Sequence, residues 1–246
     1  MSGQTDHTSG RRVDGSARRP VVRTADARLK RDARHLRNMD VTNVTADAET
    51  FTCNAYLAPE GSPTLVDAGA MDGVVDVVRE HTDDLDRVVL THQHGDHVEQ
   101  LDAVVDVFDP NVYADDDHPL RTHEITDGDV VTVGTEECEV VYTPGHADDH
   151  VSFVSTASLF SGDVVVHDDG AFDYGSFGRT DYPGQSRERL IESIRTLLER
   201  MPDGVEGMYS GRNSRSRTRR RRGRRRRRRT ATHPTPARRG RRRGPA

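Results

Sequence analysis

The sequence predicts an α/β fold in which two mixed β-sheets pack together and helices cover their outer faces. Between residues 39 and 211, short β-branched segments alternate with amphipathic helical patterns, ending in a helix and a last strand. A sheet buries one face against a second sheet and the other under helices, so this alternation favours a layered sandwich. The segment has about 173 residues, enough for one domain with its own core.

The first half of this domain is expected to form a strand meander followed by two helices. Turn residues such as Pro59-Glu60-Gly61 separate the early strands. A helix over residues 71–81 is predicted because apolar side chains recur at i, i+3, i+4 and i+7, and a helix over residues 98–108 stops before Pro110. The predicted strands are residues 41–44, 51–57, 64–66, 87–90 and 111–114.

The second half is expected to contain two hairpins, a long helix and a final strand. Gly134 marks the turn of the first hairpin, and Ser186 has the residue type of a helix N-cap. The predicted strands are residues 130–133, 139–143, 151–154, 159–161 and 206–210. The expected core face of the helix after Ser186 consists of Leu190, Ile191, Ile194, Leu197, Leu198 and Met201.

Charge divides the chain into three parts. Residues 1–38 contain ten basic and four acidic residues, residues 39–211 contain eight and 37, and residues 212–246 contain eighteen and none. The net charges are therefore +6, −29 and +18. The first part lacks apolar periodicity and the last consists largely of Arg, Pro, Thr and Gly, so we expect both to be disordered extensions of the folded domain.

The acidic domain contains no Lys, because Lys30 is the only one in the chain. Molar salt shortens the screening length to about 3 Å and mutes the self-repulsion of such a surface, so we predict a halophilic protein. Cys53 and Cys138 lie far apart without a CxxC motif, which indicates small buried thiols in a reducing compartment. No apolar run reaches the ~18 residues of a membrane span, and we expect a cytoplasmic location without a membrane partner.

The densest group of chemically active residues is Thr91-His92-Gln93-His94-Gly95-Asp96-His97, directly after the predicted strand 87–90. Neutral imidazole and carboxylate are the usual ligands of catalytic Zn²⁺, and a loop at a strand end can aim alternate side chains at one point. A packed core has no use for this density of ligands. The stretch therefore predicts a metal site, and it is similar to the HxHxDH signature of the metallo-β-lactamase fold superfamily.

This resemblance implies an αββα sandwich and a centre of one or two Zn²⁺ ions, with Fe²⁺ as the alternative. Two more strand ends match it, Thr143-Pro144-Gly145-His146 and Ser161-Gly162-Asp163. The metal ligands that the resemblance implies are His92, His94 and His146 for one ion, Asp96 and His97 for a second, and Asp163 as a bridge. Asp67 matches an acidic position that orients a ligand imidazole. Catalysis would use a metal-bound hydroxide that Asp96 orients.

The segment Gly178-Arg179-Thr180-Asp181-Tyr182 resembles the GRTD segment of glyoxalase II-like (hydroxyacylglutathione hydrolase-like) thioester hydrolases and of related persulfide dioxygenases. The resemblance implies hydrolysis of a small thioester or similar ester. Arg179, Asp181 and Tyr182 are the candidate substrate contacts, although Arg179 could instead pair with Asp181 and anchor the loop. The separate helical domain that holds glutathione in full-length glyoxalase II has no room here, so the thiol stays open.

The chain departs from the resembled family where the last metal ligand is expected. The family's final strand ends in Gly-His-Gly, whereas this chain has Gly211-Arg212-Asn213-Ser214. A guanidinium cannot coordinate a metal ion, so we expect weak binding of a second ion and impaired activity. We interpret the change as a frameshift, because losing two nucleotides from GGA-CAC-GGA-ACT-CC turns Gly-His-Gly-Thr-Pro into Gly-Arg-Asn-Ser. The same shift turns repeated GAC codons for Asp into CGA codons for Arg.

Three other functions stay open on the sequence. A mononuclear iron persulfide dioxygenase would use His92, His146 and Asp163 as two imidazoles and one carboxylate, without the missing ligand. A metal-dependent phosphodiesterase or nuclease is the second. The third is a non-catalytic nucleic-acid binder, since the Arg-rich residues 212–246 would neutralise phosphates if that tail is genuine, although it lacks interleaved aromatic residues.

Overall fold

Two β-sheets form the centre of the computed structural model, which describes residues 39–167 and 175–212. The first sheet consists of β1 (Thr42–Asn43), β2 (Tyr56–Ala58), β3 (Thr64–Val66), β4 (Arg87–Val89), β5 (Asn111–Ala114) and β6 (His123–Glu124), hydrogen-bonded in this order. The second consists, in spatial order, of β13 (Gly207–Ser210), β10 (Ser158–Gly162), β9 (Val151–Val154), β8 (Glu136–Tyr142) and β7 (Val130–Val133). A short ribbon pairs β11 (Val165–Val166) with β12 (Ser176–Phe177).

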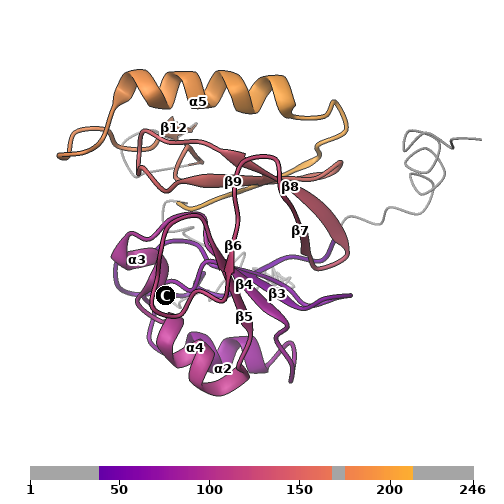
Figure 1. The fold of residues 1–246 in the computed structure, drawn as a ribbon. Helices are drawn as coiled ribbons and strands as arrows, with labels where there is room; N and C mark the ends of the chain where they lie inside the picture. The colour runs from indigo at the N-terminus through magenta and orange to yellow at the C-terminus, as the bar shows by residue number, and fades with distance from the viewer. Residues whose placement is uncertain (1–38, 168–174, 213–246) are drawn as a thin grey trace, which may run out of the picture. The chain divides into compact units, whose positions relative to one another are not determined.

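Helices cover the outer faces of both sheets. The helices are α2 (Val74–Arg79), α3 (Gly95–Val98), α4 (Leu101–Phe108) and α5 (Arg187–Arg200). Figure 1 shows α5 along the outer side of the second sheet, and α2 and α4 beneath the first. The layers therefore run helix, sheet, sheet, helix, and the predicted αββα sandwich is confirmed. Both sheets are mixed, because β1 to β3 and β7 to β10 run antiparallel whereas β3 to β6, and β13 beside β10, run parallel.

Three apolar clusters hold these layers together. Leu57 and Leu65 of the first sheet belong to the cluster under α2 and α4. Val140 and Phe153 lie in the cluster between the two sheets, together with Val66 of β3. The third cluster joins α5 to the second sheet and contains side chains such as Val141, Leu159, Leu190 and Leu197. Each of these side chains is nearly or fully buried, and burial of a side chain of this size contributes about 1.5–3 kcal/mol.

The predicted strand 51–57 is wrong in its first half, since β2 begins only at Tyr56. The Thr45 hydroxyl donates to the Cys53 carbonyl at 2.8 Å and accepts from the Ala55 amide at 3.0 Å. These bonds to a side chain replace the ladder bonds that would have extended the strand. Phe51 is left 73% exposed.

The predicted helices are shorter or divided. Helix 71–81 is reduced to α2, which follows Gly73 at φ +87°. Helix 98–108 begins only at Leu101, as α4, and Val98 is instead the last residue of α3, because the Gln100 amide donates to the Gly69 carbonyl at 3.0 Å and the chain turns between the two helices. This break lets α3 carry Asp96 and His97 at the end of β4.

The core face predicted for α5 is wrong at two positions. Ile191 and Leu198 are 41% and 62% exposed, whereas Leu190 and Leu197 are each 3% exposed. Each residue is rotated by about 100° from the one before it, so a helix that packs on one side alone cannot bury both members of each adjacent pair. The sequence also gave no expectation of β6, β11 or β12.

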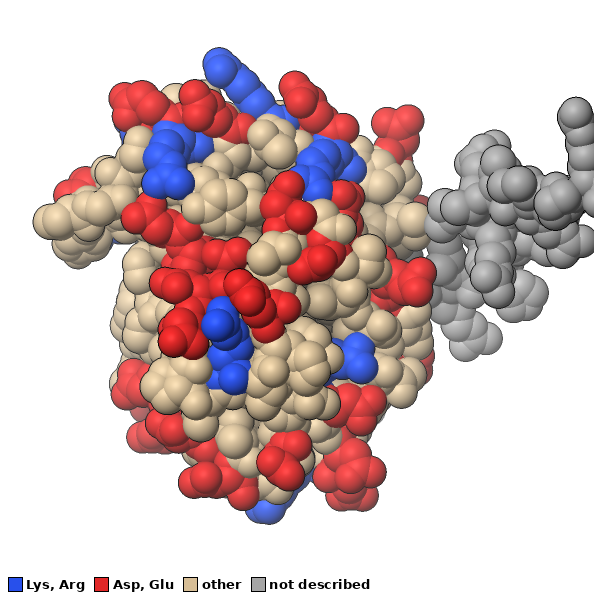
Figure 2. Space-filling view, viewed as in Figure 1, with Lys and Arg blue, Asp and Glu red and all other residues tan. Residues whose placement is uncertain are grey.

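Among the described residues, no helix has both the length and the apolar character needed to cross a membrane. Among the charged side chains on the face seen in Figure 2, Asp and Glu predominate, with basic side chains scattered among them. The expected extensions, residues 1–38 and the tail from residue 213 onward, lie outside the described residues. The hypothesis of nucleic-acid binding depends on this tail and therefore also concerns residues outside the described part of the chain.

Candidate metal centre

The predicted ligands follow the C-terminal ends of strands from both sheets. His92 comes after β4, His146 after β8, and Asp163 directly after β10. His94 is the N-cap residue of α3, whose first turn carries Asp96. The strand ends of the two sheets meet at one rim, so the fold brings these side chains together from segments up to 71 residues apart, as in the pair His92 and Asp163.

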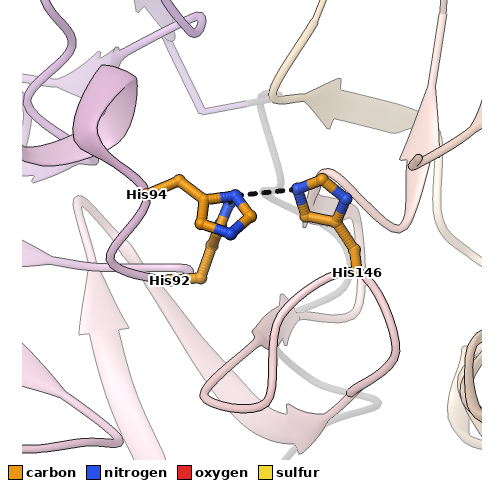
Figure 3. A group of neighbouring side chains, drawn as sticks. All are labelled: His92, His94 and His146. Carbon is orange, nitrogen blue, oxygen red and sulfur yellow. Dashed lines mark hydrogen bonds between the residues drawn. The ribbon is translucent and has the colours of Figure 1, made fainter. Parts of the chain in front are cut away.

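Three imidazoles face one another at the centre of this rim. His94 Nδ1 lies 3.1 Å from His92 Nε2 and 3.0 Å from His146 Nε2, as Figure 3 shows for the group. The His146 Nδ1–H donates to the Arg179 carbonyl at 2.9 Å, which leaves a lone pair on His146 Nε2. His94 Nδ1 can donate a hydrogen bond to one of these nitrogens, or, with its proton on Nε2, it can join them in directing a third lone pair at a cation. The group therefore fits a divalent ion bound by three imidazoles.

Asp67 orients two of the histidines from behind. Its carboxylate accepts from the Thr91 amide and the Thr91 hydroxyl, each at 2.8 Å, and from His97 Nδ1–H at 2.9 Å. Because the Thr91 hydroxyl gives its proton to Asp67, it accepts from His92 Nδ1–H at 3.1 Å. Asp67 thus holds the His97 ring directly and the His92 ring through Thr91, which are the contacts that an orienting carboxylate would make, and its role toward a metal ion stays a prediction.

Asp163 lies between the three-imidazole group and His97. Its side chain is 1% exposed, with Oδ2 at 3.4 Å from His146 Nε2 and Oδ1 at 3.6 Å from His97 Nε2. Among the described residues, Asp163 Oδ1 and His97 Nε2 are buried without a hydrogen-bond partner. Such a group costs about 1–3 kcal/mol when it stays unsatisfied, so these two atoms are suited to a bound ligand.

Arg212 occupies the other half of the predicted centre. Its Nε donates to Asp163 Oδ2 and its Nη2 donates to Asp96 Oδ2, each at 2.7 Å. Asp96 Oδ2 lies 3.9 Å from His97 Nε2, so a guanidinium stands among the three residues expected to bind a second ion. The side chains present therefore fit one metal ion at the imidazoles, whereas Arg212 occupies the position between Asp96 and Asp163 where the resemblance implies a second.

A cavity of about 860 Å³ opens over this centre. His94, Asp96, His146, Asp163 and Arg212 line its floor, and its walls include Phe51, Val166, Phe177, Arg179 and Tyr182. Arg179 donates to both carboxylate oxygens of Asp181, at 2.9 and 2.7 Å, and its guanidinium lies 4.6 Å from the centre of the Tyr182 ring. The ion pair of Arg179 with Asp181, which could anchor the loop, is therefore present. Arg179 and Tyr182 also line the cavity, whereas Asp181 contacts Arg179 but is not part of the lining.

Sequence and structure comparisons agree on what this arrangement resembles. The family model of the metallo-beta-lactamase superfamily matches residues 48–120, which contain Asp67 and the HxHxDH segment. The chain is similar to the metallo-β-lactamase superfamily in this segment and in its fold.

The curated relatives agree with the glyoxalase II-like resemblance. The hydroxyacylglutathione hydrolase of Francisella philomiragia subsp. philomiragia is 35% identical over 116 residues, which are 45% of this chain and 46% of the relative. The chain thus spans about half the length of the curated relatives it matches. Two solved structures are each 26% identical. The first is the BLEG-1 B3 metallo-beta-lactamase, with a TM-score of 0.57 over 71% of this chain and 92% of that chain. The second is ETHE1 from Myxococcus xanthus, with a TM-score of 0.56 over 68% of this chain and 73% of that chain.

Burial favours the neutral form of two predicted ligands, His92 and His146, whereas for His97 burial is outweighed by the nearby carboxylate of Asp67 and the pKa is raised. Burial lowers the pKa of His92 well below its ordinary value, and it also lowers the pKa of His146 although the neighbouring Asp163 opposes the shift. For Asp163, burial alone would raise the pKa, but His97 and Arg212 bring it well below the usual range. Neutral imidazoles and an ionised carboxylate are the forms that bind metal ions.

His150 is a residue of the centre that the sequence analysis missed. Its Nε2 accepts from the Asp163 amide at 3.1 Å, and its Nδ1–H donates to the Thr143 hydroxyl at 2.8 Å. Burial lowers its pKa to about 3, so the ring stays neutral. Gly162 has φ +48°, and a Cβ there would lie 2.5 Å from His150 Nε2, so this contact requires glycine. The available signal was the second histidine four residues after His146.

Proposed function

We propose that this chain is a metal-dependent hydrolase of the glyoxalase II-like type, acting on a small thioester or a similar ester. The observation that carries the proposal is the meeting of His92 Nε2, His94 Nδ1 and His146 Nε2, two of whose residues, His94 and His146, line a cavity of about 860 Å³. The hydroxyacylglutathione hydrolases among its relatives support the substrate class.

His92, His94 and His146 would hold the ion, for which Zn²⁺ is the proposed metal. A bound Zn²⁺ lowers the pKa of a coordinated water to about 7 and polarises a carbonyl oxygen. Asp96 lines the cavity beside these residues, and Arg212 fixes the direction of its carboxylate through Oδ2. We assign Asp96 the role of accepting a hydrogen bond from the attacking water and orienting it toward the substrate carbonyl.

The cavity walls indicate how an acyl group would be held. Phe51, Phe177 and Tyr182 are 73%, 58% and 57% exposed, and all three line the cavity. Exposed aromatic rings around a polar floor suit a substrate with an apolar portion and one reactive carbonyl. We propose that Arg179 and Tyr182 contact the substrate, and that Asp181 holds Arg179 in place.

Turnover of a thioester tests the proposal. The Zn²⁺-loaded full chain, assayed in molar salt with a 2-hydroxyacyl thioester of glutathione, is expected to release free thiol. Asp96→Asn should lower kcat by about 100-fold or more, because the carboxylate that orients water is lost. Asp102→Asn, an exposed residue of α4, is the matched control and should keep the wild-type rate. Absence of thiol release from the metal-loaded protein would remove the proposal.

A mononuclear iron persulfide dioxygenase is the second candidate. The position of Asp163 favours it, because Asp163 Oδ2 lies 3.4 Å from His146 Nε2 and so places a carboxylate beside the imidazoles of the centre. Two imidazoles and one carboxylate are the typical ligands of oxygen-activating Fe²⁺. Elemental analysis of the purified protein, followed by oxygen-uptake measurements with a persulfide, separates the two candidates. Zinc with thiol release supports the hydrolase, and iron with oxygen uptake supports the dioxygenase.

A further inference from the structure

The position of Arg212 is fixed by its surroundings on every side. Its side chain is 20% exposed and bridges Asp96 and Asp163, which are 13% and 1% exposed. The guanidinium carbon lies 4.5 Å from the centre of the Phe51 ring. The Arg212 carbonyl accepts from the His167 amide at 3.2 Å and from the Ser210 hydroxyl at 3.0 Å. Arg212 is therefore an integral part of the site.

Gly211 allows the chain to bring Arg212 close to Asp163. Its amide donates to the Gly162 carbonyl at 2.8 Å, and its carbonyl accepts from the Asn54 amide at 2.8 Å. A Cβ on Gly211 would lie 2.3 Å from Asp163 Oδ1, closer than any real contact. The end of β13 is thus pressed directly against Asp163, and the next side chain has to lie within the metal centre.

We propose that the guanidinium of Arg212 takes the place of the second metal ion, so that this chain holds one metal ion, at His92, His94 and His146. The inference rests on the proposed metal centre and goes beyond it, because it fixes the stoichiometry of the centre and names the residue that sets it.

The hydrogen bonds support this replacement. A second ion would need the carboxylates of Asp96 and Asp163 together with His97 Nε2. Arg212 already uses one oxygen of each carboxylate in bonds of 2.7 Å, and charge-assisted bonds of this kind are roughly twice as strong as neutral ones. A guanidinium cannot lose its proton to make room, so the ion would have to displace the whole side chain.

The charge balance points the same way. Asp67, Asp96 and Asp163 supply three negative charges around the centre, and Arg212 is a fixed positive charge bonded to two of them. A divalent ion at His92, His94 and His146 would bring the positive charge to three. A second divalent ion beside Arg212 would then exceed the three carboxylates by at least two positive charges in a largely buried site, where like charges repel strongly.

Metal stoichiometry tests the inference without relying on activity. The full chain is stripped with a chelator, dialysed against excess Zn²⁺ in molar salt, freed of unbound ion, and analysed for zinc per chain. Wild type is expected to hold one zinc ion and Arg212→His two. Arg212→Met, which removes the charge but adds no ligand, should bind its second ion at least tenfold more weakly than Arg212→His does. Arg179→His introduces an imidazole elsewhere on the cavity wall and should stay at one.

Substitution with Co²⁺ gives an independent signature of the same number. An isolated Co²⁺ spectrum is expected for wild type, and magnetic coupling between two ions for Arg212→His. Two ions in wild type would overturn the inference while leaving the proposed hydrolase intact, and one ion in a folded Arg212→His protein would overturn it as well. Wild type that binds no ion would overturn both the inference and the proposed function.

Discussion

The buried carboxylate of Asp67 shows how much of the centre depends on a single residue that would not itself bind metal. Its φ of +60° is rare for a residue with a side chain, and strain of this kind persists only where the surroundings enforce it. Here the Asp67 amide donates to the Val89 carbonyl at 3.0 Å, which ties the strained residue to β4 just before the ligand loop. The same residue then orients His97 directly and His92 through Thr91.

Asp67→Asn is expected to weaken metal binding at the three imidazoles by about 10–100-fold, because the amide cannot accept from both Thr91 and His97 as the carboxylate does. A competition titration with a chromophoric chelator measures the change. Asp72→Asn, an exposed residue nearby, serves as the control and should bind the ion as wild type does. Equal affinities of wild type and Asp67→Asn would show that the carboxylate does not position the ligands.

His150→Leu should destabilise the protein at pH 7, since the Asp163 amide and the Thr143 hydroxyl lose a buried partner at about 1–3 kcal/mol each. The difference in the free energy of unfolding between wild type and His150→Leu should become smaller as the pH falls. In wild type the folded-state pKa is lowered from 6.5 to about 3, so the folded form excludes a proton that the unfolded form binds. Stability from this group is present above pH 6.5 and is lost toward pH 3, by up to about 1.4 kcal/mol per pH unit.

Urea unfolding of both proteins between pH 7 and pH 4 measures this difference. His81→Leu, at an exposed position, should follow the wild-type curve throughout. A deficit of His150→Leu that stays constant with pH would contradict a neutral, buried His150.

At the scale of elements, the short segments at strand ends position the residues of the centre, whereas the longest helix does not. The four-residue helix α3 begins at Gly95, directly after His94, and places Asp96 and His97 within one turn of each other. β13 runs parallel to β10, so the residues after both strands arrive at the same rim, and this pairing brings Arg212 to Asp163. By contrast, α5 carries no predicted ligand and covers the second sheet, and the hydroxyl of its expected N-cap residue, Ser186, accepts from the Arg189 amide.

Adjacent leucines of α5 test which of its faces is buried. Leu197→Ala should lower the free energy of unfolding by about 2–5 kcal/mol, because it leaves a void in the cluster that joins α5 to the second sheet. Leu198→Ala, one position further on and 62% exposed, should change it by less than about 0.5 kcal/mol. Chemical denaturation of the two variants gives the comparison, and equal losses would mean that α5 packs on a different face.

At the scale of the whole molecule, the strongest feature is the charge of the folded domain. Residues 39–211 carry 37 acidic and eight basic residues, and the acidic side chains spread over the surface seen in Figure 2. Some are paired, as Asp127 and Glu139 are with Arg200, but the Arg residues are too few to balance the carboxylates. The net repulsion is long-ranged, so salt should screen it more than it screens the buried pairs.

Raising KCl from about 0.1 M to about 2 M should therefore raise the Tm by about 5 °C or more, as the screening length falls below the spacing of the surface charges. Differential scanning calorimetry measures the shift. An excluded neutral solute such as sucrose, which does not screen charge, should produce a smaller rise. A Tm that is flat or falls with salt would remove the prediction of a halophilic protein.

The sequence by itself predicted the residues of the centre and the type of fold. The spacing His92, His94, Asp96 and His97 after an apolar strand is a local pattern, and alternating strand and helix patterns are local too, so both can be read before any contact is known. Strand ends predicted from such patterns carried His146 and Asp163 to the expected rim.

Only the tertiary structure decided what depends on pairing between distant segments. Arg212 meets Asp96 and Asp163 across 116 and 49 residues, through the parallel pairing of β13 with β10, and no local pattern contains that register. The role of His150, the break between α3 and α4, and the exposed side of α5 likewise depend on which neighbour each segment packs against. Sequence periodicity specifies which face of an element is apolar, whereas the partner that covers it is selected by the packing of the whole domain.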